Sequence, residues 1–126
     1  MPKHDEHYIQ NQILVALSAN GCDIYRINVG KVPIRDNTGK LIRIFRAGPP
    51  NGHPDLYGFI QKTHEIFYIE VKDETGKPRP DQIRFHEHLQ KYGIIHGIAR
   101  SVDDARMIVE GALVGYGFDD YEGGIA

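Results

Sequence analysis

Hydrophobic and polar residues alternate along this chain with two different periods, which predict helices and strands in turn. Apolar residues at helical spacing predict helices over residues 5–20, 80–92 and from residue 101 onward. Apolar or alternating runs predict strands over residues 22–29, 55–61, 66–72 and 94–99. Residues 31–46 read as a β-hairpin or extended arm that turns at 36–39.

This order of elements, α-β-β-β-α-β-α, predicts an α/β fold. A strand–helix–strand crossover over residues 66–99 requires one parallel pair of strands inside an otherwise antiparallel sheet. We therefore expect a mixed β-sheet flanked by helices. The chain has 126 residues, enough for one hydrophobic core. We expect a single domain over residues 1–115, followed by an acidic, Gly-rich and loosely ordered tail over 116–126.

Composition narrows the class of protein without naming a function. Hydrophobic residues at 40% and charged residues at 25% are values typical of globular domains. Cys22 is the one cysteine of the sequence, so an internal disulfide and a cysteine-based zinc site are excluded. No apolar run approaches the roughly 18 residues of a membrane span, and residues 1–6 lack a signal-peptide core. We expect a cytoplasmic protein.

The distribution of charge is more informative than the formal net charge of −2. Between residues 24 and 46 there are six basic residues and one acid, Asp36, whereas acids dominate after residue 101. A basic stretch on a near-neutral protein can still follow phosphate groups, because the local field decides. The alternative is a solvated hairpin face. The candidate DNA contacts are Arg26, Asn28, Lys31, Arg35, Arg43 and Arg46.

Two acids and a lysine, Asp55, Glu70 and Lys72, are the candidate catalytic residues of this sequence. Side chains alternate faces along a strand, so Glu70 and Lys72 point to the same side of the apolar strand 66–72. Charges on a covered strand are costly unless they are paired or bound. A structural ion pair between Glu70 and Lys72 is one explanation. With Asp55 on the neighbouring strand, a bound cation is the better one, although a Pro-Asp pair is also common in plain turns.

Mg²⁺ matches such a cluster because it prefers oxygen ligands and keeps several waters. The carboxylates of Asp55 and Glu70 and the backbone carbonyl of Val71 could supply the protein ligands. Lys72 could orient the attacking water or stabilise charge that develops on a phosphate. The seven histidines favour no zinc site, since His86 and His88 lie two positions apart on a predicted helix.

Three short motifs give the chain a family resemblance. They are Gly52-x-Pro54-Asp55, then Ile69-Glu70-Val71-Lys72, then Pro80-x-Gln82. Together they resemble the PD-(D/E)xK nuclease superfamily and, within it, the VRR-Nuc (virus-type replication-repair nuclease) family. The resemblance implies a restriction-endonuclease-like core. It also implies that Asp55 and Glu70 bind the metal, that Lys72 is catalytic and that Gln82 shapes the site. Glu6 matches a helix acid that reaches the metal directly or through water.

The resemblance also implies a function. Members that stand alone are similar to phage proteins and act on branched DNA as homodimers, in bacterial or phage-infected cells. We therefore expect a Mg²⁺-dependent endodeoxyribonuclease, with Mn²⁺ as a substitute, that prefers four-way (Holliday) junctions and takes part in DNA repair. A nuclease that nicks flaps is the nearest rival. A catalytically silent DNA-binding module and a hydrolase of small phosphoesters are the others.

Overall fold

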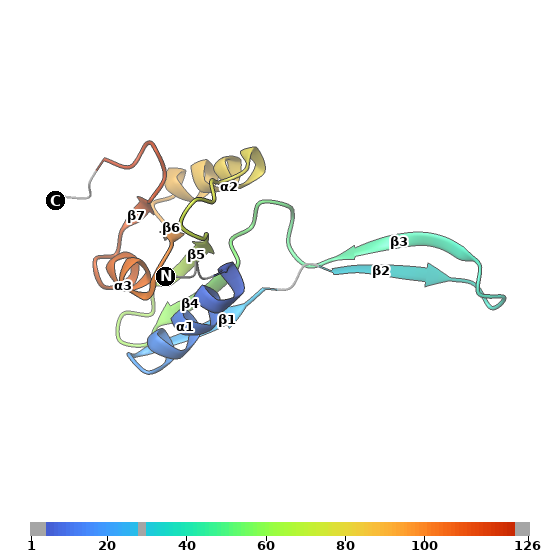
Figure 1. Ribbon diagram of the computed structural model, residues 1–126, viewed down its shortest axis with the longest axis horizontal. Coiled ribbons are helices and arrows are strands. Elements are labelled where there is room, and N and C mark those ends of the chain that lie inside the picture. The colour runs from blue at the N-terminus through green and yellow to red at the C-terminus, as the bar shows by residue number, and fades with distance from the viewer. Residues whose placement is uncertain (1–4, 28–29, 123–126) are drawn as a thin grey trace.

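The computed structural model describes residues 5–27 and 30–122, which form a sheet-centred core and a protruding hairpin (Figure 1). The helices are α1 (Glu6–Ser18), α2 (Pro80–Lys91) and α3 (Val102–Glu110). The strands of the core are β1 (Cys22–Arg26), β4 (Leu56–Ile60), β5 (Ile66–Val71), β6 (Ile95–Ala99) and β7 (Val114–Tyr116). The hairpin consists of β2 (Gly30–Arg35) and β3 (Leu41–Ala47). Within the described residues, no helix is long and apolar enough to cross a membrane.

The core sheet is mixed, in the order β1-β4-β5-β6-β7. The pairs β1–β4 and β4–β5 are antiparallel, and β5–β6 is the parallel pair expected from the crossover through α2. A second parallel pair, β6–β7, follows a crossover through α3. The sequence did not predict β7, because three residues that include a glycine carry no periodic signal. The α/β prediction is confirmed, with two parallel pairs instead of one.

Helices cover both faces of this sheet. The α1 and α3 helices contact each other and the strands on one side, whereas α2 contacts β6 and β7. The apolar stripe of α1, made by Ile9, Ile13 and Leu17, is buried in the core. The α1 helix begins where expected, because the Asp5 carboxylate accepts a hydrogen bond from the Tyr8 backbone N–H at 2.8 Å.

The expectation of a loosely ordered tail is wrong for residues 116–122. Tyr116 belongs to β7, and Phe118 is buried against the rest of the domain. Its ring stacks on His86 of α2, with 3.8 Å between the ring centroids. Glycines and paired acids in this segment suggested disorder, but one aromatic anchor outweighs that composition because it buries a large apolar surface.

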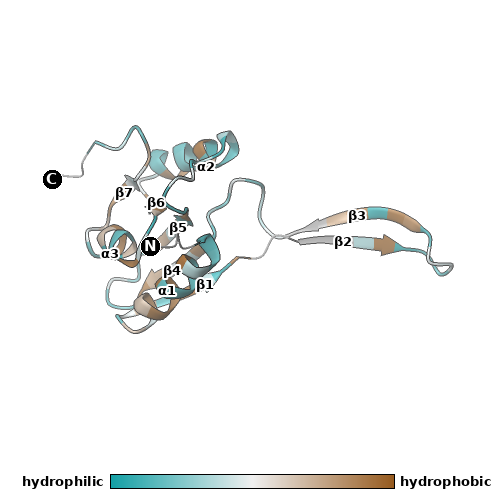
Figure 2. Ribbon diagram, viewed as in Figure 1, coloured by the Kyte–Doolittle hydropathy of each residue, from teal (hydrophilic) through white to brown (hydrophobic). Residues whose placement is uncertain are grey.

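The β2–β3 hairpin, called the arm below, extends away from the core (Figure 1). Its turn lies where the sequence placed it: the Asp36 carboxylate accepts hydrogen bonds from the backbone N–H groups of Thr38 and Lys40, at 2.8 and 3.0 Å. The strands contact mainly each other, and a register shift follows Ile34. Figure 2 shows apolar stretches on this arm, and Leu41, Ile42, Ile44 and Phe45 are all exposed.

Candidate active site

Asp55, Glu70 and Lys72 lie in the wall of one pocket of about 240 Å³. Glu6, Arg79 and Gln82 line the same pocket. Glu70 faces it from β5 and Lys72 from the position directly after β5, while Ile69 and Val71 point to the hydrophobic core on the other side of the sheet. The alternation read from the sequence thus places the two charged side chains together. They are also deeply buried, with 3% of Glu70 and 6% of Lys72 exposed.

Asp55 is held beside β5 by a backbone hydrogen bond. It precedes β4, and β4 pairs antiparallel with β5 through Leu56 and Ile69. The Asp55 Oδ2 atom accepts a hydrogen bond from the Val71 backbone N–H at 2.9 Å. The Asp55 backbone carbonyl accepts another from the N–H of Ile27 at 2.9 Å. This carboxylate is therefore fixed against the strand that carries Glu70.

Glu70 is the most perturbed acid of the site. Burial first, and then the neighbouring Asp55 carboxyl, together raise the pKa of its carboxyl to about 10 against the opposing charges of Lys72 and Arg79. Its Oε2 atom is buried and has no hydrogen-bond partner among the described residues. An orphaned buried oxygen is costly. The site therefore favours either a proton or a cation at this position.

The loop after β5 brings Glu6 to Lys72. A side chain at Gly76 would meet Asp73 Oδ1 at 3.2 Å, Lys72 Cδ at 3.4 Å and Glu6 Oε1 at 3.6 Å, so these groups crowd around one glycine. Asp73 Oδ1 accepts from the Gly76 backbone N–H at 2.7 Å. Arg100 donates to the carbonyls of Asp73 and Gly76, both at 2.6 Å. Asp73 and Arg100 thus shape the loop, a role the sequence did not indicate.

The start of α2 closes the other wall of the pocket. Gly52, with φ of +89°, packs so closely on α2 that an added Cβ would lie 2.3 Å from the Asp81 carbonyl oxygen. Gln82 is buried, and its Oε1 atom accepts a hydrogen bond from the Arg79 backbone N–H at 2.9 Å. His53 packs edge-on against the rings of Tyr68 and Phe85. The loop that carries Asp55 is thereby fixed to the helix that carries Gln82.

Comparison with known families identifies this arrangement. The family model of the VRR-NUC domain matches residues 8–103, which include the β4–β5 pair and the start of α2. The chain belongs to the VRR-NUC domain family. A solved structure described as a VRR_NUC domain is 25% identical, covers 82% of this chain and 92% of its own, and has a TM-score of 0.56. No curated protein matches. The VRR-NUC domain is a nuclease-type, DNA-processing domain with a restriction-endonuclease-like core.

The VRR-NUC pocket has donors that fit a hard divalent cation. Oxygen atoms of Asp55 and Glu70 face one another, and Glu70 Oε2 has no other partner among the described residues. In that part of the chain, no three His, Cys, Asp or Glu side chains converge closely enough to bind a metal by themselves. A cation bound here would take the two carboxylates and the Val71 carbonyl, with waters as its other ligands, and Glu6 lines the same pocket.

The candidate DNA contacts whose side chains the structure describes do not lie on one surface. Arg26 turns back toward α1, where its Nη2 donates to Asn11 Oδ1 at 2.6 Å. On the arm, Arg35 donates to the Gly39 carbonyl at 3.2 Å, and Arg43 lies over the Phe45 ring at 5.9 Å. Lys31 and Arg46 pair across the arm, with side chains outside the described part, and Asn28 lies outside the described residues altogether. Among the described side chains of the candidates, Arg35 and Arg43 are therefore the ones that the arm exposes to solvent.

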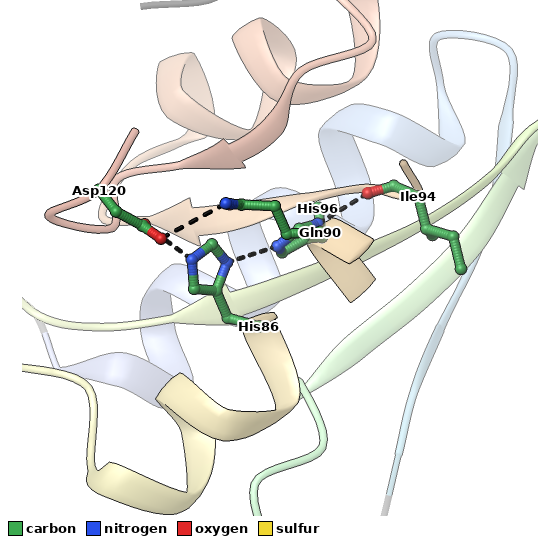
Figure 3. Close-up of polar contacts among 5 residues, drawn as sticks. All are labelled: His86, Gln90, Ile94, His96 and Asp120. Carbon is green, nitrogen blue, oxygen red and sulfur yellow. Dashed lines mark hydrogen bonds and ion pairs between the residues drawn. The ribbon is translucent and has the colours of Figure 1, made fainter. Parts of the chain in front are cut away.

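The VRR-NUC core also contains a buried histidine pair between α2 and β6 (Figure 3). His86 Nδ1 and His96 Nε2 are 2.7 Å apart, and His86 Nε2 lies 2.8 Å from Asp120 Oδ1. His96 Nδ1 lies 2.7 Å from the Ile94 carbonyl oxygen, which can only accept. The spacing in the sequence could not reveal this pair, since His86 and His96 meet only where α2 packs on β6.

Proposed function

We propose that this protein is a divalent-metal-dependent endodeoxyribonuclease that cuts phosphodiester bonds in branched DNA. The observation that carries the proposal is the unpartnered, buried Glu70 Oε2 atom beside Asp55 and Lys72 in an open pocket. A purely structural ion pair would leave both carboxylate oxygens of Glu70 satisfied. A catalytically silent DNA-binding module has no need for two acids in so costly a place.

Each side chain of the pocket has a role in this proposal. Asp55 and Glu70 hold Mg²⁺, or Mn²⁺ in its place, together with the Val71 carbonyl. The bound cation supplies a more acidic water and screens the charge of the phosphodiester. Lys72 donates hydrogen bonds that orient the attacking water and offset the charge developing on the phosphate oxygens. Gln82 fixes the first turn of α2 beside the pocket, and Glu6 orients a water.

Four-way junctions are the preferred substrate in this proposal, and the active form is a homodimer. A four-way junction has two-fold symmetry, so a two-fold dimer would set one pocket on each of two matching strands. The cations of the arm, Arg35 and Arg43 among them, would follow the DNA backbone without reading its sequence. Nicking of a flap, by one protomer acting alone, is the second candidate.

One set of cleavage assays tests these proposals. Labelled linear, flap and four-way DNA are incubated with the protein in Mg²⁺ or in EDTA. We expect metal-dependent cleavage of branched DNA, its loss in Lys72→Ala with junction binding retained, and no effect of Lys62→Ala in the exposed β4–β5 turn. Absence of metal-dependent cleavage on every substrate would reject the nuclease proposal.

Mixing wild-type and Lys72→Ala protein tests the dimer. A dimeric resolvase with one inactive protomer should nick only one strand of a four-way junction, so singly nicked product should accumulate as the inactive share rises. If the two proteins act independently, product falls in proportion to the wild-type fraction and paired nicks persist.

A further inference from the structure

A wide groove of about 770 Å³ runs along the outer side of α2, next to the catalytic pocket. The two hollows adjoin, because Pro50, Asn51 and Arg79 line both of them. A strand of DNA whose scissile phosphate lies in the small pocket must leave it in some direction. This groove is one such exit, and it is about three times larger than the pocket itself.

The rim of the groove is cationic. Arg79, at its boundary with the pocket, is largely exposed and is held at 3.2 Å from Asp81. Arg84 lies one turn further along α2, is exposed, and has no ion-pair partner in the described part of the chain. Asp81 is the one acid in the lining of the groove, and it already accepts a hydrogen bond from the Gln82 backbone N–H at 2.9 Å. The field over the groove thus favours a phosphate.

Part of the groove lining is apolar. Pro50 and Pro80 contribute ring surfaces, and Phe85 is half-buried, with its ring 5.0 Å from that of His53. Cations beside flat apolar surfaces are the combination that binds unpaired nucleotides, since phosphates meet the cations while sugars and bases lie on the rings. A paired duplex hides the faces of its bases in the stack and cannot use such a lining.

From this lining we propose that the groove binds an unpaired stretch of DNA next to the scissile phosphate, with Arg84 holding a phosphate of that stretch. The inference rests on the proposed nuclease function, and it concerns those branched substrates, such as flaps, that have unpaired nucleotides beside the cut. Arg79 lines both hollows, so it would contact the strand where the strand passes from the groove into the pocket.

Binding of a short oligonucleotide tests the groove independently of cleavage. Anisotropy of a fluorescent single-stranded oligothymidylate is measured in EDTA with wild type, Arg84→Ala and Arg106→Ala, an exposed arginine on α3. We expect Arg84→Ala to raise the Kd about tenfold and to reduce its salt dependence, with Arg106→Ala unchanged. Equal Kd values for all three proteins would overturn the proposal, and this readout stands even if no DNA is cut.

Cleavage kinetics then test position. Two branched substrates share the scissile sequence, but only one has unpaired nucleotides beside it. Arg84→Ala should raise KM about tenfold on the unpaired-flank substrate, leave kcat unchanged, and have little effect on the paired-flank one. Equal losses on both substrates would show a general electrostatic role instead and would reject the subsite. Charge reversal, Arg84→Glu, should enlarge the same difference, and its melting temperature should match that of wild type.

Discussion

The Asp55 carboxylate and the Val71 backbone N–H are joined by a hydrogen bond of 2.9 Å across the gap between the loop before β4 and the end of β5. This bond holds the Asp55 carboxylate against the end of β5, next to the strand position that carries Glu70. The Val71 carbonyl is the proposed third protein ligand. Asp55 therefore has two roles: its hydrogen bond fixes the position of the loop beside β5, and its negative charge belongs to the pocket.

Asp55→Asn is expected to separate these two roles. The amide oxygen can still accept the hydrogen bond from Val71, so the free energy of unfolding should change by less than about 1 kcal/mol. The lost charge should lower the affinity for Mg²⁺ or Mn²⁺ and cut cleavage at least about 100-fold, as removal of groups that act on transition-state charge does. Metal titration and cleavage rates measure both effects. Asp23→Asn, on β1 outside the pocket, serves as control, and retention of full activity by Asp55→Asn would contradict the assignment.

Glu70→Gln is expected to stabilise the metal-free protein at neutral pH while abolishing cleavage. The Glu70 pKa is raised in the folded state from an ordinary value of 4.5. Above pH 4.5 the unfolded chain releases a proton that the folded chain retains, so stability is lost as the pH rises toward the folded pKa. The variant should exceed wild type in EDTA at pH 7.5 by about 1–3 kcal/mol, and the difference should vanish toward pH 4.5.

Denaturant unfolding in EDTA from pH 4.5 to 8 measures this difference, with Glu87→Gln on the exposed face of α2 as control. Added Mg²⁺ should raise the melting temperature of wild type and not that of Glu70→Gln. A variant less stable than wild type at every pH would show that the carboxylate is satisfied without a cation.

Gly52→Ala is expected to disrupt the loop that carries Asp55. The change combines an unfavourable backbone at φ of +89° with a Cβ only 2.3 Å from the Asp81 carbonyl oxygen. Gly21→Ala has a similar φ of +85° and open space around it, so it isolates the backbone cost of about 1 kcal/mol. Gly52→Ala should lose about 2–4 kcal/mol in urea unfolding and should reduce cleavage. Equal losses in the two variants would rule out the close approach to α2.

Phe118→Ala is expected to destabilise the whole domain, because the segment after β7 is part of the fold. The ring is buried and stacks on His86 with an interplanar angle of 5°. Its removal should cost about 2–4 kcal/mol in the free energy of unfolding. Tyr92→Ala, an exposed aromatic on the same side of the sheet, should cost less than about 1 kcal/mol. A loss in Phe118→Ala as small as that of Tyr92→Ala would mean that the segment detaches freely.

Buried His96 is expected to make the protein less stable in mild acid. Burial lowers the His96 pKa from its ordinary value of 6.5, and the neighbouring His86 lowers it further, against Asp120 and the Ile94 carbonyl. Below pH 6.5 the unfolded chain binds a proton that folded His96 excludes, so stability is lost as the pH falls, by at most about 1.4 kcal/mol per pH unit. Melting temperatures between pH 7.5 and 5.5 should show a shallower slope in His96→Gln than in wild type. His7→Gln, at an exposed position of α1, should keep the wild-type slope, and a steeper slope in His96→Gln would contradict the assignment.

The sequence by itself determined the α/β class, most element positions and the shared face of Glu70 and Lys72. These follow from periodicity and capping, which act within a few residues of the chain. The hairpin turn at Asp36 and the start of α1 at Asp5 belong to the same group, because a side chain and its backbone partner are neighbours in sequence. The three motifs around Asp55, Glu70 and Gln82 could also be recognised in the sequence, because each one is a short run of neighbouring residues.

Only the tertiary structure decided which distant segments of the chain contact one another. Four features join segments that are far apart in the sequence. They are the short β7 strand, the packing of Phe118 on His86, the contacts of His86 with His96 and Asp120, and the groove beside Arg84. Such contacts depend on which surfaces pack together, and packing energy is gained only after the loops between them close. Local sequence patterns therefore do not predict these long-range contacts. The acids of the site were therefore visible in the sequence, whereas the surfaces that surround them were not.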